Sequence, residues 1–567
     1  MAADFRKTGT MIRISKALSE GEKTATASRK EEVKKGLERL GIPCDLDQVP
    51  NIAVLGAGGA VRAMISLYGT LVELKKFNFL DCVMYLGGVS GSTWCLSTLY
   101  KNEDWAENIE ALEKQQCEKL AKGQWDFEKA MKALIEAAED ECYSLTDFWS
   151  YFLIHGMLNQ LDESELSTHR RSCENGKNPY PIYTAVDKET YQKQNAGTWF
   201  EFTPHEAGIP GLGAYVDIKH LGSIFENGKL TEEGKEKNLC YLQGLWGSAL
   251  GSEEQLCETV RDALMDFLKQ DRTGDSSSSP PNQDEDDKKL SLLFKAYLSV
   301  LELQLYKPSD RSGSDKHFDE LQNSLKSHIS QKTYELLRSI HQSWFSADAE
   351  TRKKGSLKLC QALDMDLGGF TRHFHSVLHN VLRKTYSCLM NWTWGSTRNF
   401  LYHSCEVSFP DLTSKPVVSL IDAGLAINAA YPPLLRPQRQ VKLILSFDFS
   451  AGDPFLTIRK AAEYCEAHGI PFPEIDEREL QDVDNPLDCY IFRGEHAPTI
   501  IHCPLFNRVN CTDKIAEYRD QFSTFKMKYS EEDIEKLLTA AKKNVVNIQH
   551  KIVEEIKRTV CFPSQAT

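Results

Sequence analysis

One serine stands between glycines directly after an apolar run, in the segment YLGGVSGSTW at residues 85–94. Gly88 and Gly91 flank Ser90 at positions minus two and plus one. The preceding residues indicate a short buried strand and the following ones a helix, which is the strand–turn–helix arrangement of a nucleophile elbow. Such a turn exposes a strained hydroxyl, and the helix N-terminus favours developing negative charge. The elbow pattern G-x-S-x-G ends here in Ser92, and a plain glycine-rich loop is the alternative.

Two further segments carry groups that an acyl-transfer site needs. LGAGGAVRAM places glycines and Arg62 at a predicted helix start, where backbone N–H groups form an anion site. LIDAGLAIN places Asp422 at the end of an apolar strand, where desolvation would raise the pKa of its carboxyl group and suit it to act as a general base. A solvated helix arginine and a turn-capping aspartate are the alternatives. A dinucleotide fingerprint is a rival for the first segment, but it requires glycine or alanine where Val61 stands.

Apolar strands alternating with helices must position these residues. NIAVLG, DCVMYL, KPVVSLID and QVKLILSFD are such strands. The pattern predicts an α/β fold with a central, mostly parallel sheet and flanking helices, with the candidate residues at the carboxyl ends of the strands. Residues 262–400 are polar and helical beside the linker QDRTGDSSSSPPNQDEDDKK, which indicates an insertion that caps the site. We therefore expect a polar N-terminal extension at 1–45, a catalytic domain at 46–560 containing this insertion, and a tail at 561–567.

The composition of the chain argues against several classes of partner and site. The net charge of -14 argues against nucleic acid binding, and no uncharged apolar run of 18 residues indicates a transmembrane helix. Sixteen scattered cysteines without C-x-x-C pairs are typical of reduced thiols. HFHSVLH places His373, His375 and His379 close together, but no nearby cysteine or carboxylate completes a zinc set, so a surface histidine cluster is the better interpretation. The basic runs at 436–442 and 542–558 are either solvated faces or contacts for lipid head groups.

The segments GAGGAVRAM, GVSGSTW and DAGLAIN…LLRPQR resemble the catalytic motifs of the cytosolic phospholipase A2 (group IV) family. SLTDFW, TWFEFTPHEAG, GLWGSALG and LSFDFSAGDPF match that family in the same order, and the resemblance runs from about residue 45 to 550. It implies a patatin-like active site with Ser90 as nucleophile and Asp422 as its base, without a catalytic histidine.

The resemblance also implies how the site binds its substrate. The backbone amides of Gly59 and Ala60 would be the oxyanion donors, and Arg62 and Arg439 would be functional arginines that bind substrate. The family has glycine where this chain has Ala60. If the backbone there needs a positive φ, alanine costs about 1–2 kcal/mol; if it is already helical, the cost is near zero.

The resemblance implies a phospholipase A2 and lysophospholipase that acts through an acyl-serine intermediate, releases free fatty acid and lysophospholipid, and can pass the acyl group to another acceptor. We also expect the enzyme to be calcium-independent. We expect no cofactor, no metal, no obligate protein partner, and a cytoplasmic enzyme bound peripherally to intracellular phospholipid membranes. About 45 residues precede the first core strand, too few for a C2 domain. Ser564 stands where a prenylation box needs cysteine, so we expect no prenyl group at Cys561. A catalytically weak lipid-binding relative and a Rossmann-type oxidoreductase are the alternatives.

Overall fold

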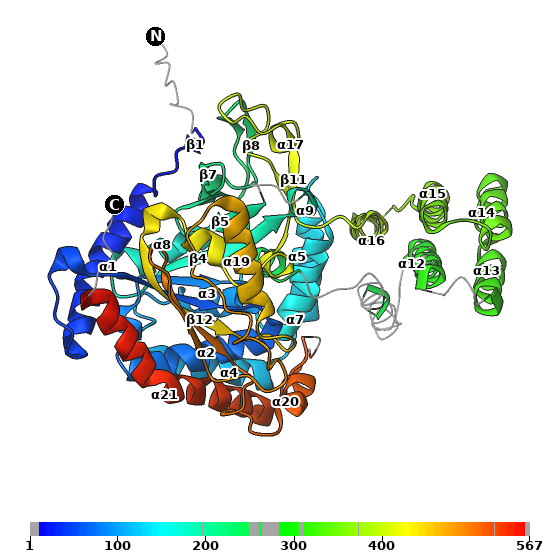
Figure 1. Cartoon of the computed structure of the whole chain (residues 1–567). Helices are drawn as coiled ribbons and strands as arrows, with labels where there is room; N and C mark the ends of the chain where they lie inside the picture. Colours follow the sequence, from blue (N-terminus) through cyan, green and yellow to red (C-terminus); the bar gives the residue numbers. More distant parts are fainter. Residues whose placement is uncertain are drawn as a thin grey trace, which may run out of the picture. The chain divides into compact units, whose positions relative to one another are not determined.

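The computed structural model describes residues 11–193, 198–248, 258, 260–262, 283–305, 311–371, 373–524, 526 and 528–561 (Figure 1). The chain divides into two compact units. The first consists of Met1–Ala130, Trp149–Leu250 and Gly395–Thr567, and the second of Met131–Phe148 and Gly251–Trp394. The insertion expected at 262–400 therefore falls mainly in the second unit, which also takes in residues 131–148. The tail at 562–567 and most of the expected linker lie outside the described residues.

Twelve of the described strands form one mixed sheet in the first unit. Its centre is parallel and has the spatial order β4 (Tyr180–Asp187), β3 (Tyr85–Gly88), β2 (Asn51–Gly56), β12 (Val441–Asp448) and β14 (Thr499–Pro504). The outer strands are antiparallel: β5 (Trp199–Phe202), β6 (Glu206–Ile209), β7 (Ala214–Asp217) and β1 (Arg13–Ile14) beyond β4, and β13 (Tyr490–Phe492) beyond β14. The expectation of a mostly parallel sheet holds only for the centre, because short connections between β4 and β7 permit antiparallel pairing. Strands β8 (Ile224–Glu226) and β9 (Lys229–Glu232) form a separate hairpin.

Strand β11 (Val417–Asp422) differs from the parallel strand that its sequence suggests. It runs antiparallel to β4, with Asp422 opposite Ala185, and β10 (Ser396–Arg398) pairs with its other edge. Strand β3 ends at Gly88, opposite Tyr183, so β11 occupies the same edge of β4 beyond that point. Because β11 runs in the opposite direction, its carboxyl end meets the carboxyl end of β3.

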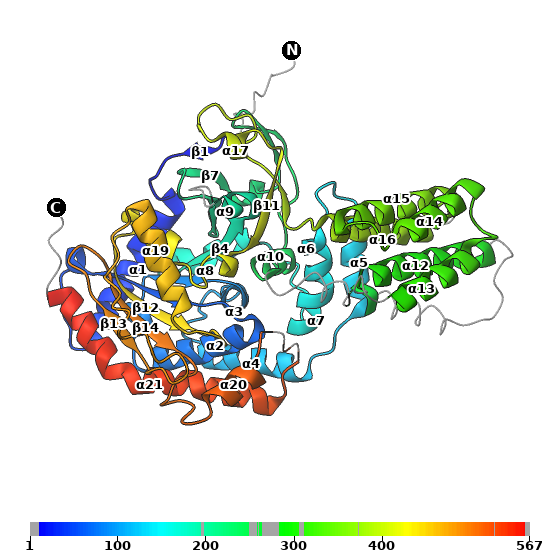
Figure 2. The same cartoon turned by 45° about the vertical axis from the view of Figure 1, so that its right-hand side comes forward.

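Helices cover the sheet of the first unit. Helix α2 (Ala60–Lys76) is buried on nearly all faces because α21 (Glu531–Cys561) packs along it (Figure 2). A Cβ at Gly69 would lie only 3.2 Å from Leu538, so the glycine permits this close contact. The other helices of this unit are α1 (Glu20–Arg39), α3 (Gly91–Leu99), α4 (Ile109–Lys122), α7 (His155–Leu158), α8 (Arg170–Glu174), α9 (Lys188–Gln192), α10 (Leu239–Trp246), α17 (Pro410–Thr413), α18 (Tyr431–Leu434), α19 (Leu456–His468) and α20 (Ile515–Gln521). Helix α5 (Phe127–Ala137) begins in the first unit and continues into the second, to which α6 (Leu145–Phe148) belongs.

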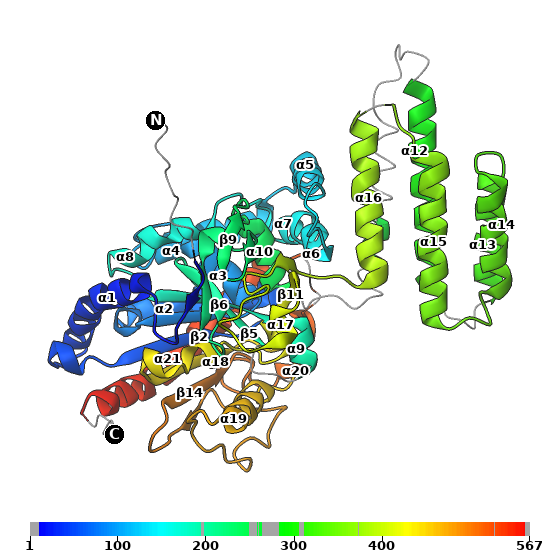
Figure 3. The ribbon, with the colours of Figure 1, turned by 90° about the horizontal axis from the view of Figure 1, so that it is seen from above.

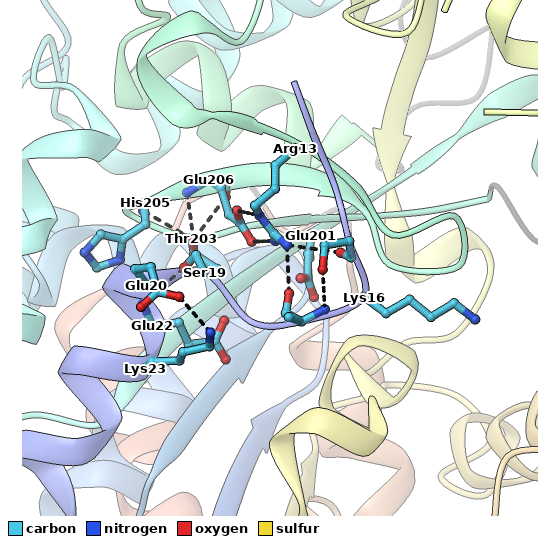
Figure 4. Close-up of polar contacts among 12 residues, drawn as sticks. Arg13, Lys16, Ser19, Glu20, Glu22, Lys23, Glu201, Thr203, His205 and Glu206 are labelled. Carbon is cyan, nitrogen blue, oxygen red and sulfur yellow. Dashed lines mark hydrogen bonds and ion pairs between the residues drawn. The ribbon is translucent and has the colours of Figure 1, made fainter. Parts of the chain in front are cut away.

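The part of the expected polar extension (1–45) that the structure describes, residues 11–45, contributes to the sheet and core of the first unit. Strand β1 pairs with β7, and Arg13 Nε donates to Glu206 Oε2 at 2.9 Å (Figure 4). Ser19 caps α1 by accepting a hydrogen bond from the Glu22 amide at 3.0 Å. The buried Arg29 guanidinium donates to backbone carbonyls of the segment before β3 and of the loop before β4. The bond to Val83 O is 2.9 Å long. The buried polar residues of α1, Glu22 and Arg29, therefore have structural partners in the first unit.

The second unit contains five helices, in the part of it that the structure describes after residue 282: α12 (Gln283–Leu305), α13 (Arg311–Leu325), α14 (Gln331–Ser343), α15 (Ala349–Leu367) and α16 (His373–Asn391) (Figure 3). They lie side by side around an apolar core. His375 is buried and not at the surface as expected; its Nε2 lies 2.5 Å from Asp287 Oδ1, while His379 Nε2 lies 2.7 Å from Asp364 Oδ1. In the described residues we find neither a metal-binding group of three His, Cys, Asp or Glu side chains nor a helix long and apolar enough to cross a bilayer.

Candidate active site

Ser90 occupies a sharp turn between β3 and α3. Its backbone has φ 51° and ψ −124°, and the residue forms the N-cap of α3. A non-glycine residue with positive φ stores about 1–3 kcal/mol of strain and is held there by its surroundings. A Cβ at Gly91 would lie 1.8 Å from Ala60 O, so the position after Ser90 requires glycine. Ser92, which replaces the last glycine of the elbow pattern, donates its hydroxyl to Ala57 O at 2.6 Å and ties the elbow to the glycine-rich loop.

Asp422 ends strand β11 beside this turn. In the parallel register of β3 on β4, Gly88 faces Tyr183; two residues further along the same edge, Ala185 faces Asp422. The aspartate thus takes the place on β4 that Ser90 would have occupied if β3 had continued. The residue is 1% exposed, and its Oδ1 accepts a hydrogen bond from the Gly424 amide at 2.7 Å.

The glycine-rich loop after β2 forms the third side of the site. The Gly58 amide donates to Asn428 Oδ1 at 3.1 Å, and Asn428 Nδ2 donates back to Gly58 O at 3.2 Å. Gly59 has φ 152°, and Ala60, the first residue of α2, has φ 51°. Of the two expectations for Ala60, the structure has the positive φ, so the alanine carries the strain of about 1–2 kcal/mol. The first N–H groups of a helix have no partner within it, which leaves the Ala60 amide able to donate to a ligand.

One cavity of about 300 Å³ brings these residues together. The predicted site residues that line it are Gly59, Ala60, Arg62, Ser90 and Asp422. Further lining residues that the sequence interpretation did not assign are Gly58, Gly424, Leu425, Asn428, Ser450, Ala451, Gly452, Asp453, Leu456, Thr457, Lys460 and Thr524. Some had a signal, since Asn428 closes the DAGLAIN segment and Ser450–Asp453 follow the carboxyl end of β12. Leu456 and Lys460, on α19, had none.

Arg62 lies in the first turn of α2 and is 1% exposed. Its Nε donates to Phe449 O at 2.7 Å and its Nη1 donates to Phe522 O. Burial lowers the pKa of the guanidinium to about 10. Arg62 therefore connects α2 to the segments that follow β12 and α20, and it contributes a cation to the wall of the cavity.

Arg439, for which the resemblance implies a role in binding substrate, is not among the residues that line this cavity. The side chain is fully buried, and it donates to Glu22 Oε1 at 2.8 Å and to Glu201 Oε2 at 2.6 Å. Burial alone would lower the pKa of the guanidinium, but the carboxylates of Glu201 and Glu22 raise it well above its usual value. Arg436 also forms an ion pair with Glu201. Glu22 of α1 and Glu201 of β5, both labelled in Figure 4, are thus brought to one guanidinium from distant parts of the sequence.

Comparison with known proteins decides the family. A family described as lysophospholipase catalytic domain matches residues 52–259. Cytosolic phospholipase A2 gamma of Homo sapiens is 38% identical over 558 residues, which cover 96% of this chain and 96% of the relative. The chain belongs to the cytosolic phospholipase A2 family. The Mus musculus gamma protein is 37% identical, over 96% of this chain and 92% of the relative.

The solved structure of human GIVD cytosolic phospholipase A2 has a TM-score of 0.64 to this chain at 25% sequence identity, over 97% of this chain and 68% of that chain. The predicted family and fold class are therefore confirmed, with the sheet mixed rather than mostly parallel. The region that matches the lysophospholipase catalytic domain contains Ser90 and Arg62 but ends well before Asp422.

Proposed function

We propose that this chain is a phospholipase A2 and lysophospholipase that hydrolyses fatty-acyl esters of glycerophospholipids. The observation that carries the proposal is the single cavity in which strained Ser90, buried Asp422 and the Gly59–Ala60 backbone meet, in a member of the cytosolic phospholipase A2 family. A serine, a carboxylate and two backbone donors suffice for ester cleavage.

In the proposed mechanism, Ser90 Oγ attacks the ester carbonyl carbon and Asp422 takes the hydroxyl proton. The Gly59 and Ala60 amides donate to the oxyanion of the tetrahedral intermediate. The intermediate collapses to an acyl-serine as the lysophospholipid or glycerophospho-alcohol leaves with the proton from Asp422. Water then attacks the acyl-serine and gives its proton to Asp422. The second tetrahedral intermediate releases the fatty acid, and Ser90 regains its proton. An alcohol in place of water would make the reaction a transacylation.

The two arginines have different proposed roles. Arg62 lines the cavity, and its bonds to two backbone carbonyls hold it there, so it presents a positive charge to an anionic lipid. Arg439 lies outside the cavity between two carboxylates. We assign it a positioning role that holds α1 against the sheet.

The mouth of the cavity supports contact with a lipid surface. Leu425 and Leu456 line it with exposed fractions of 40% and 49%, which are high for leucine in the described residues. Apolar side chains at the rim of a lipid site gain free energy when a bilayer covers them. We propose peripheral, reversible membrane binding in the cytoplasm and no requirement for calcium, because the proposed steps use only protein groups and water. Equal hydrolysis of vesicles in excess chelator and in micromolar calcium is the expected result.

The dyad is tested by Ser90→Ala, Asp422→Asn and the double variant, with Ser66→Ala as the control, since Ser66 is a buried hydroxyl of α2 that does not line the cavity. Each dyad variant should lose at least about 1,000-fold in turnover, and the double variant should be little worse, because the two residues act as a unit. A fluorophosphonate probe should label Ser90 in the parent chain. Substantial turnover by folded Ser90→Ala would contradict the proposal, and lipid binding without labelling would favour a non-catalytic relative.

A further inference from the structure

The cavity holds a second cation that the proposed mechanism does not use. Of the described residues that line it, only Arg62 and Lys460 carry a positive charge. Lys460 lies on α19 and is half-buried. No hydrogen bond or ion pair among the described residues involves its ammonium group, whereas the Arg62 guanidinium already donates to two backbone carbonyls. The guanidinium keeps three further N–H donors, whereas all three donors of the Lys460 ammonium group are unused among the described residues.

The cavity carboxylate other than Asp422 does not neutralise this lysine. Asp453, which also lines the cavity, lies 3.0 Å from Arg459 Nη1 and accepts a hydrogen bond from the Phe455 amide at 2.8 Å. Its charge is compensated by its own partner. Ammonium groups with unused donors bind phosphate oxygens as point charges.

The neighbours of Lys460 specify where such a phosphate would lie. Leu456 precedes Lys460 by four residues, so both lie on one face of α19, and Thr457 lies beside them. Leu456 is the more exposed and marks the apolar mouth. In a glycerophospholipid the phosphate lies at the same boundary, between the acyl esters and water.

We propose that Lys460 is a specificity-determining residue that binds the phosphate of the lipid substrate and so favours phospholipids over uncharged glycerides. The proposal rests on the proposed function of this cavity. It assigns the head-group contact to α19, while Ser90 and Asp422 act on the ester.

The test is binding rather than turnover, so that it does not depend on the dyad. The probes are monomeric 1-O-octyl-glycero-3-phosphocholine and 1-O-octylglycerol, which are ethers that the enzyme has no ester to cleave. Lys460→Met removes the charge but keeps the apolar stem, Lys460→Arg keeps the charge, and Lys557→Met on α21 is the control, since Lys557 is exposed and outside the cavity.

Lys460→Met should weaken binding of the phosphocholine ether about tenfold and change octylglycerol binding less than twofold, because a hydrogen bond to a charged partner is lost for one ligand only. Lys460→Arg and Lys557→Met should stay within about threefold of the parent chain. An equal effect of Lys460→Met on both ethers, or no effect on either, would overturn the assignment. Binding of inorganic phosphate as tight as that of the ether phospholipid would overturn it too, since the site would then recognise a free anion. Loss of hydrolysis in the dyad variants bears on the proposed function alone.

Discussion

Ser90 and Ala60 both have a positive φ, 51° at each, which few non-glycine residues adopt. Gly91, the residue after Ser90, packs against Ala60, since a Cβ at Gly91 would lie 1.8 Å from Ala60 O. Strain at Ser90 accompanies a hydroxyl that the chemistry needs. The side chain of Ala60 is only a methyl group that the chemistry does not need, so a substitution by glycine can remove the strain at this residue.

Ala60→Gly should stabilise the protein by about 0.5–1 kcal/mol. The substitution relieves a left-handed alanine, worth about 1–2 kcal/mol, and increases the entropy of the unfolded chain, which costs about 0.4–1 kcal/mol. The urea midpoint of unfolding measures the difference. Activity should be retained, because the amide donor is unchanged.

Ala63→Gly is the matched control for this prediction. Ala63 lies in the same helix, is fully buried and is not among the residues with positive φ. Glycine there should destabilise the protein by about 1 kcal/mol. If both glycine variants were destabilised alike, the strain at Ala60 would be disproved.

At the scale of single residues, the sequence predicted several residues that meet in the cavity. It did not predict the hydrogen-bond and ion-pair partners of every candidate site residue. Ser90, Asp422 and Arg62 lie in short motifs that their own neighbours make recognisable. Arg439 lies in such a motif too, yet its carboxylate partners come from α1 and β5, hundreds of residues away and in no periodic pattern. Their catalytic and binding roles stay predictions until the variants are measured.

At the scale of elements, Arg439 connects two parts of the first unit. Its guanidinium forms ion pairs with Glu22 on α1 and Glu201 on β5, and it also donates a hydrogen bond to Pro433 O at 2.6 Å. All three charged side chains are essentially buried. Removing one partner of such a group leaves uncompensated charge in the interior.

Arg439→Met should therefore destabilise the first unit by about 3–5 kcal/mol, because two carboxylates lose their shared cation. Thermal melting and the yield of folded protein measure this loss. Arg478→Met, at an exposed arginine paired with Asp476, is the control and should change stability by less than about 1 kcal/mol. A normally stable Arg439→Met protein with a raised KM would instead support the substrate-binding role first expected for Arg439.

The alternation of strands and helices predicted the parallel centre of the sheet, because each of β2, β3 and β12 is an apolar run followed by a helical pattern. The direction of β11 was not predictable in this way. Its sequence is as apolar as that of a parallel strand, and its direction follows from where β3 ends. We expected the N-terminal segment to be a polar extension because it is rich in charged residues, which usually lie at the surface. Two of them, Glu22 and Arg29, are buried in the structure.

At the scale of the whole molecule, the sequence predicted only part of the division into two units. The change to a polar helical composition predicted the insertion from 262 onwards. Residues 131–148 belong to the second unit as well, although they precede it by more than 100 residues. The Tyr143 hydroxyl lies 2.6 Å from Thr385 Oγ1, and the Asn380 side chain donates to Ala138 O, so this early segment packs on α16. Whether the second unit caps the site stays a prediction.

Leu456→Asp should lower hydrolysis of phospholipid vesicles about tenfold and leave hydrolysis of a monomeric short-chain ester nearly unchanged. An exposed leucine that enters a bilayer gains about 1.5–3 kcal/mol, which the carboxylate loses. Leu487→Asp is the matched control, because Leu487 is 41% exposed but lies outside the cavity.

Equal losses on vesicles and monomers would contradict a role of Leu456 in membrane contact. Equal losses in Leu456→Asp and Leu487→Asp would point to a general effect of added negative charge on vesicle binding. Vesicle sedimentation separates binding from turnover in each variant.

The meeting of β3 and β11 on one edge of β4 has a consequence for recognising active members of this family. The spacing between nucleophile and base is set by the register of two strands that share a neighbour and are not paired with each other. A slip of β11 by two residues would keep every side chain on its face of the sheet and yet move the carboxylate by about 7 Å. A homologue with identical motif residues could therefore be inactive. Insertions or deletions just before β11 should predict loss of activity better than substitutions within the motifs.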